Sequence, residues 1–179
     1  DDKYIWSLAV DAKGTVFAGT GDKGVVYRVS ADGRGEKFFE TKAMHGVALA
    51  FDPAGERLAV VEESRITRLW RIDVERRTAH ELGAELGHFF NVEDVAWNAS
   101  GTRVATAAGD RTVKIWDAAA FGRDLDTSSA AIMTLDDPRG AVLAVRFGAQ
   151  HPFEAHRYSV ATGSSDWSVR LWDVRESRP

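Results

Sequence analysis

The feature that most constrains the fold of this 179-residue chain is an internal repeat. A short apolar segment recurs four times, and each copy is followed by two more short apolar runs. The four leading segments are residues 5–10, 46–51, 92–97 and 142–147. A chain with such a period is built from one supersecondary unit used several times, so it folds by stacking neighbouring units.

The local composition of each unit predicts strands. Three leading segments run into a turn that opens with Asp or Asn and closes with Gly, at residues 11–14, 52–55 and 98–101. Asp and Asn bond the backbone of such turns, and Gly accepts the positive φ that closes them. The apolar runs are short and rich in β-branched residues, and none has a long stripe at helical period. The sequence therefore predicts an all-β chain.

The third run of each unit ends on an aromatic residue. These residues are Tyr27, Trp70, Trp116 and Trp172. The dipeptides Trp116-Asp117 and Trp172-Asp173 and a period of roughly 45 residues resemble those of the WD-repeat β-propeller family. The resemblance implies a β-propeller of four-stranded antiparallel blades, with about four blades in this chain. We therefore expect residues 1–179 to form a single propeller unit, with blade-like repeats at about 4–42, 43–84, 85–129 and 130–174.

The resemblance also implies a buried tetrad of His, Ser or Thr, Asp and Trp. The third unit matches it with His88, Thr106, Asp110 and Trp116, which we interpret as a structural network and not a catalytic one. Since a buried carboxylate needs partners, removal of Asp110 is expected to cost about 2–4 kcal/mol.

The other units depart from this tetrad. The fourth keeps Thr162, Asp166 and Trp172, with Pro138 or a neighbour in place of the His. The second has Val60 and Ser64 at the Thr and Asp positions, and the first has Tyr27-Arg28 for Trp-Asp.

The chain lacks one outer strand. Candidate outer strands are residues 36–40, 78–82 and 130–135, which makes three for four inner triplets. Neither terminus offers enough residues for a fourth. Three architectures remain open: part of a longer propeller, a half-ring that pairs with a copy of itself or with other chains, and a closed four-bladed ring. An open ring would expose apolar blade faces that favour association.

One end of the blades is the expected binding surface. The candidate partner-binding residues are Trp6, Phe89, Phe90, Asn91, Glu93, Arg111, Arg139 and Trp167. Exposed Trp, Phe and Arg side chains are typical of interaction hot spots. The alternative for Phe89 and Phe90 is that they fasten their loop onto the blade. Two long insertions, residues 118–129 and 148–157, are expected at the opposite end.

No enzyme signature is present. There is no phosphate-binding Gly loop before a helix and no Gly-x-Ser-x-Gly elbow. The spacing of His151, Glu154 and His156 matches no known ligand pattern, so neither a metal nor a cofactor is expected. The sequence has no cysteine, which excludes disulfides, thiolate zinc sites and a cysteine nucleophile.

The composition of the chain disfavours some classes of partner. The net charge of −4 argues against nucleic acid, and no apolar run approaches the roughly 18 residues that span a membrane. The opening residues Asp1-Asp2-Lys3 do not resemble a signal peptide, which favours an intracellular setting, cytoplasmic or nuclear. The leading hypothesis is a non-catalytic scaffold for proteins or peptides. The alternative is an enzyme or small-ligand binder that uses the central channel, where only Glu93, Asp94 and Arg146 stand near the mouth.

Overall fold

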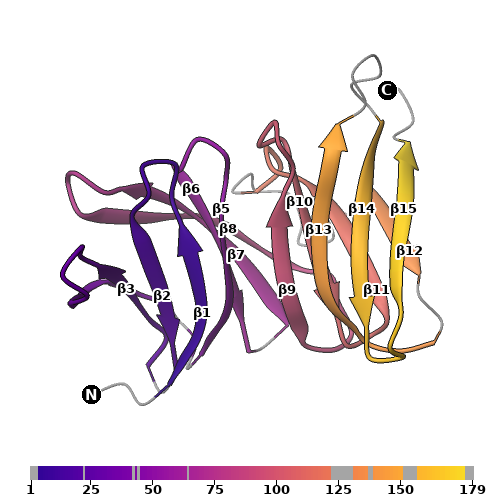
Figure 1. The fold of residues 1–179 in the computed structure, drawn as a ribbon, viewed down its shortest axis with the longest axis horizontal. Coiled ribbons are helices and arrows are strands. Elements are labelled where there is room, and N and C mark those ends of the chain that lie inside the picture. The colour runs from indigo at the N-terminus through magenta and orange to yellow at the C-terminus, as the bar shows by residue number, and fades with distance from the viewer. Residues whose placement is uncertain are drawn as a thin grey trace.

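The computed structural model describes residues 4–21, 23–41, 43, 45–63, 65–121, 131–136, 139–150 and 157–175. These residues form fifteen strands in four antiparallel sheets, which lie side by side in chain order (Figure 1). Among them no helix is long and apolar enough to cross a membrane. The prediction of an all-β propeller-like chain with about four blades is confirmed.

Each sheet is one blade, and three of the four have four strands. Blade 1 contains β1 (Ile5–Val10), β2 (Val16–Thr20), β3 (Val25–Val29) and β4 (Gly35–Glu40), and blade 2 contains β5 (Gly46–Phe51), β6 (Arg57–Glu62), β7 (Ile66–Asp73) and β8 (Thr78–Leu86). Blade 3 contains β9 (Val92–Trp97), β10 (Arg103–Ala108), β11 (Thr112–Asp117) and β12 (Met133–Asp136), and blade 4 contains β13 (Val142–Gln150), β14 (Arg157–Ser164) and β15 (Val169–Arg175). The described part of blade 4 has no outer strand, as the sequence predicted.

The third blade extends beyond residue 129, where the sequence repeats were divided. Strand β12 pairs with β11, and Met133 lies opposite Ile115. The sequence repeat that starts at residue 130 therefore begins with β12, which is the outer strand of blade 3. Repeats in the sequence and blades in the structure are offset by this one strand.

The blades form an open arc. The inner strands contact one another in the order β1, β5, β9 and β13, and the first and last blades lie at opposite ends (Figure 1). Leu8 on the outer face of blade 1 is 63% exposed, and Leu171 on the outer face of blade 4 is 77% exposed. The closed four-bladed ring is therefore wrong for this chain, because ring closure would bury both faces.

The cores lie between blades. Phe17 of blade 1 packs with Leu58 and Trp70 of blade 2, and the next interface groups Leu69 of blade 2 with Val95 of blade 3. Burial of one such side chain is worth about 1.5–3 kcal/mol, so each blade is stabilised mainly by its neighbours.

The predicted turns after the inner strands are confirmed. Gly14, Gly55 and Gly101 have φ of 84°, 71° and 68°. The N–H of each donates to the carbonyl of the Asp or Asn that opens its turn. Only glycine adopts this conformation without steric cost.

The pairing register corrects the alignment of the first unit. Trp116 lies opposite Val104 on the neighbouring strand. The equivalent of Val104 in blade 1 is Val16, and Val16 lies opposite Val29. Val29-Ser30 therefore stands at the Trp-Asp position, and the assignment of Tyr27-Arg28 was wrong because it followed aromatic character instead of strand pairing.

Candidate functional site

The antiparallel strand order sorts the connections onto two rims of the arc. We call the rim with the β6–β7, β10–β11 and β14–β15 turns the hairpin rim, and it also carries the connections that lead into inner strands. The other rim, which we call the opposite rim, carries the turns between inner and second strands. The predicted partner-binding residues lie on the hairpin rim.

Below this rim, blade 3 holds a chain of hydrogen bonds. The indole Nε1 of Trp116 donates to Thr106 Oγ1 over 2.9 Å, and Thr106 Oγ1 lies 2.7 Å from His88 Nε2. His88 Nδ1 lies 3.0 Å from Asp110 Oδ2. With one donated bond for each hydroxyl and N–H, Trp116 donates to Thr106, Thr106 donates to His88, and His88 donates to the Asp110 carboxylate.

The protonation states suit this arrangement. Burial lowers the pKa of His88, although the charge of Asp110 acts in the opposite direction. Burial acts to raise the pKa of Asp110, but hydrogen bonds from Thr112, from the Phe89 N–H and from His88 lower it further than burial raises it. A neutral His88 and a charged Asp110 result near neutral pH. Their side chains are 2% and 5% exposed, so the pair has little access to a substrate.

The tetrad also anchors the loop before β9. Phe89 N–H donates to Asp110 Oδ2 over 2.9 Å, and Arg65 of blade 2 donates to the Phe89 carbonyl over 3.3 Å. Backbone groups thus fasten this loop. The side chains of Phe89 and Phe90 are 79% and 65% exposed, so they do not fasten it by burial.

A row of strained turns runs along the hairpin rim. Arg65, Arg111 and Trp167 stand at the same turn position of blades 2, 3 and 4, with φ of 66°, 70° and 67°. A residue other than glycine in this region costs about 1–2 kcal/mol. Such strain is frequent at functional sites. Sequence reasoning missed Arg65, although its position in the repeat matches those of Arg111 and Trp167.

The remaining predicted residues are spread along the rim. Trp6 is 54% exposed, and its ring lies 5.9 Å from that of His45. Asn91 is exposed and its carbonyl accepts the N–H of Gly109. Glu93 is half-buried and Arg139 is exposed. Phe89, Phe90 and Asn91 lie together, whereas Trp6 and Trp167 belong to the terminal blades.

The other blades hold incomplete versions of the tetrad. In blade 4, Trp172 Nε1 donates to Thr162 Oγ1 over 3.0 Å, and the guanidinium of Arg170 and the hydroxyl of Ser168 lower the pKa of Asp166. In blade 2, Trp70 Nε1 is buried with no partner among the described residues, because Val60 replaces the Thr. Pro138 and Ser64 lie outside the described residues.

Two of the three predicted channel groups, Asp94 and Arg146, join neighbouring blades. Asp94 accepts the N–H of Val145 over 2.9 Å and pairs with Arg146, so it joins blades 3 and 4. No group of three or more metal-ligating side chains occurs in the described residues. His151, Glu154 and His156 and most of the insertion 118–129 lie outside them.

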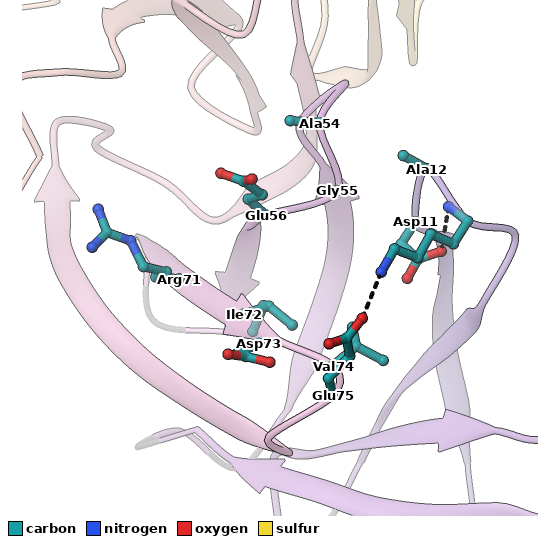
Figure 2. Close-up of a pocket in the computed structure, with 11 residues that line it drawn as sticks. Asp11, Ala12, Ala54, Gly55, Glu56, Arg71, Ile72, Asp73, Val74 and Glu75 are labelled. Carbon is teal, nitrogen blue, oxygen red and sulfur yellow. Dashed lines mark hydrogen bonds and ion pairs between the residues drawn. The ribbon is translucent and has the colours of Figure 1, made fainter.

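The opposite rim carries a cleft of about 320 Å³ between blades 1 and 2 (Figure 2). Its lining is mostly charged and includes Asp11, Lys13, Arg71, Asp73 and Glu75. This cleft could not be predicted from the sequence, because residues far apart along the chain form it.

Comparison with known proteins identifies the repeats. The family model described as "WD domain, G-beta repeat" matches residues 80–117 and 130–173. The chain is a WD-repeat protein. Both matches begin with an outer strand and continue into the next blade, which is the offset described above.

Several relatives of this WD-repeat protein match over a large part of the chain. It is 35% identical to THO complex subunit 3 of Arabidopsis thaliana over 92 residues, or 51% of the chain and 26% of that protein. It is 31% identical to the Poly(A)+ RNA export protein of Schizosaccharomyces pombe over 134 residues, or 73% of the chain and 33% of that protein. It is 29% identical to the human Pre-mRNA-processing factor 17 over 135 residues, or 75% of the chain and 21% of that protein. The chain thus spans no more than a third of these relatives.

Proposed function

We propose that this WD-repeat protein is a non-catalytic scaffold that binds other proteins or peptides through its hairpin rim. The observation that carries the proposal is the exposure of Trp167, which is 99% exposed on a backbone with positive φ. A large aromatic side chain held outward in a strained turn gains nothing from its own fold. Trp and Arg are enriched among the residues that anchor partners, and Phe is enriched in interfaces. Phe89, Phe90 and Arg111 stand on the same rim as Trp167.

The test starts from peptides selected for binding from a displayed library, with affinity then measured by fluorescence polarisation. Trp167→Ser and Phe90→Ser are each expected to weaken binding at least tenfold without lowering the melting temperature, since both side chains are exposed. Glu75→Ser on the opposite rim is the control and should leave affinity unchanged. If Trp167→Ser and Phe90→Ser both keep the affinity of the unmodified protein, the hairpin rim is not the binding surface.

The relatives support a role in protein assemblies inside the cell. One is named as a complex subunit, and others are named for pre-mRNA processing and RNA export. An intracellular protein with protein partners is consistent with these names. Direct contact with RNA is disfavoured by the net charge of −4.

We also propose that the two outer faces of the arc bind further blades. Val169 and Leu171 of blade 4 are 82% and 77% exposed. Their equivalents in blade 3, Val113 and Ile115, are 1% and 0% exposed because blade 4 covers them. The covering blades belong either to a longer polypeptide, in line with the length of the relatives, or to a second copy of this chain.

Light scattering of the 179-residue chain separates these sources. A mass near twice 19.6 kDa that returns to the monomer value in Leu171→Glu supports a second copy. A monomer or irregular aggregate that becomes uniform only in a longer polypeptide supports further blades of the same chain. A well-behaved monomer that Leu171→Glu and chain extension both leave unchanged would contradict blade binding at these faces.

A further inference from the structure

The outer face of blade 4 contains a pocket of about 260 Å³. Its lining includes Ala149 of β13, Arg157 and Ser159 of β14, and Leu171 and Asp173 of β15. Ser159 lies directly opposite Asp173, and residues two apart in a strand point to the same face, so these side chains share the outer face with Leu171. Small-molecule sites usually have about 300–1,000 Å³. A pocket of this smaller size suits a single side chain of a partner.

Each contact between blades inside the arc uses an aromatic residue at one position of the inner strand, which we call the aromatic position. In the pairing register it is occupied by Phe51 in blade 2, Trp97 in blade 3 and Phe147 in blade 4. The ring of Phe51 lies 5.0 Å from that of Phe17 of blade 1, and Phe147 packs against the cluster that contains Ile115 of blade 3. Each of these aromatic side chains thus packs onto the preceding blade.

The contact between blades 2 and 3 shows which groups receive such a ring. Trp97 Nε1 donates to the Ala50 carbonyl over 3.0 Å, and the Trp97 ring lies 4.6 Å from the guanidinium of Arg57. Leu69 belongs to the same core cluster as Trp97. Asp52 Oδ2 fixes the guanidinium, because it accepts from Arg57 Nε over 2.8 Å. The ring is therefore received by a leucine and by a guanidinium that a carboxylate holds in place.

The pocket of blade 4 lies at the equivalent place. The pairing register gives Leu171 and Ser159 the positions that Leu69 and Arg57 have in blade 2. Leu69 is fully buried beneath blade 3, whereas Leu171 is 77% exposed. Because serine is much shorter than arginine, Ser159 leaves open the space that Arg57 occupies in blade 2.

Blade 4 also has a fixed guanidinium at this place, although it comes from another residue. Arg157 lines the pocket, and the Asp173 carboxylate accepts two hydrogen bonds from its guanidinium, of 2.8 and 2.7 Å. Asp52 holds Arg57 in a similar way in blade 2. A guanidinium attracts the face of an aromatic ring. The pocket therefore fits an aromatic side chain better than an aliphatic one.

Blade 1 does not offer an aromatic side chain at the matching place. Its inner-strand residue at the aromatic position is Val10, which lies opposite Val16. A valine fills less of the pocket than an aromatic residue and gains no cation–π contact with Arg157. Blade 1 of a second copy is thus a poor occupant of this pocket.

We propose that the pocket binds the aromatic side chain at the aromatic position of a further blade, which belongs to a longer polypeptide. This inference rests on the proposed binding of further blades to the outer faces, and it selects one of the two sources given there. The relatives agree with this source, because the chain spans no more than a third of their length.

The full chain extended by one repeat provides the test. A second copy of residues 78–117 is joined after Pro179, so that residues 176–179 match in number residues 74–77, which connect β7 to β8. The copy supplies an outer strand for blade 4 and then an inner strand that carries its own Trp97. Because the sequence has no cysteine, Ala149→Cys introduces a single thiol at the pocket, and its rate of reaction with a thiol reagent reports whether the pocket is covered.

We expect the thiol of Ala149→Cys to react about tenfold more slowly in the extended chain than in the 179-residue chain. Trp97→Val in the added copy alone, which introduces the residue type of blade 1, should restore most of the fast rate. Ala12→Cys is the control, because Ala12 is exposed on the β1–β2 turn of blade 1, and its rate should be the same in all chains.

A second measurement needs no added repeat. N-acetyltryptophanamide at high concentration should slow the reaction of Ala149→Cys in the 179-residue chain, whereas N-acetylvalinamide should not. Equal effects of the two compounds would overturn the inference.

The outcomes separate this inference from the proposed binding of blades. Equal slow rates with the Trp and Val copies would show that a blade covers the face without needing an aromatic residue, which overturns the inference alone. A slow rate in a dimer of the 179-residue chain would assign the pocket to a second copy and would also overturn it. Fast rates in both extended chains would contradict blade binding at this face altogether.

Discussion

Asp110→Ala is the sharpest test of how the third blade is held together. The carboxylate accepts from four donors: His88 Nδ1 at 3.0 Å, the Phe89 N–H at 2.9 Å, the Thr112 N–H at 3.0 Å and the Thr112 hydroxyl at 2.7 Å. Truncation to alanine removes all four acceptor contacts at once. It also leaves the buried end of the donor chain without its final acceptor.

The expected loss follows from how far water can reach each donor. The His88 ring is 2% exposed, so its lost acceptor costs about 1–3 kcal/mol. Phe89 lies at the exposed rim and Thr112 is half-buried, so water replaces their bonds at a cost of about 0.5 kcal/mol each. The sum over these four contacts is a decrease of about 2.5–4.5 kcal/mol in the free energy of unfolding.

Urea denaturation followed by tryptophan fluorescence measures this change. With a slope of about 2 kcal/mol per molar urea, the midpoint should fall by about 1–2 M. Asp117→Ala in the same blade is the matched control. The Asp117 carboxylate is 43% exposed, and its distance of 3.5 Å from Arg103 is that of a loose ion pair. That surface pair is worth less than about 1 kcal/mol. If both variants lose the same small amount, the buried network is not a major source of stability.

Three further changes test the packing and electrostatics of blades 2 and 3. Because burial lowers the pKa of His88, this residue takes up a proton at a higher pH in the unfolded chain than in the folded one. The free energy of unfolding should therefore fall as the pH drops below about 6.5. His88→Gln should flatten this pH dependence between pH 7 and 5. Gly87→Ala should cost about 1–3 kcal/mol in thermal unfolding, since a Cβ there overlaps the ring of Trp116; an unchanged melting temperature would show that the ring relaxes freely. Glu62→Gln should cost about 3 kcal/mol, because Glu62 is 1% exposed and bonds Arg68 over 2.9 Å; a loss below 1 kcal/mol in urea denaturation would contradict a role for this buried ion pair.

The residue pattern was enough to predict the repeat, the strands and the side chains of the tetrad. Short apolar runs between Asp and Gly turns have only one regular structure available to them. The spacing of His88, Thr106, Asp110 and Trp116 also follows from positions in one repeat. The prediction from sequence was wrong where residue type and strand register disagree, as in blade 1. There Tyr27 has the expected aromatic character, but Val29 has the pairing position.

Tertiary structure decided everything that depends on neighbouring blades. The same apolar pattern leaves Leu171 77% exposed and Ile115 fully buried, because only the blade that stands beside each residue sets its burial. The cleft beside Gly55 likewise exists because two turns from different blades approach each other. A repeat sequence encodes each blade locally, through strand propensity and turn chemistry. Which faces meet, and which charges are left without partners, follows from the stacking of blades in space.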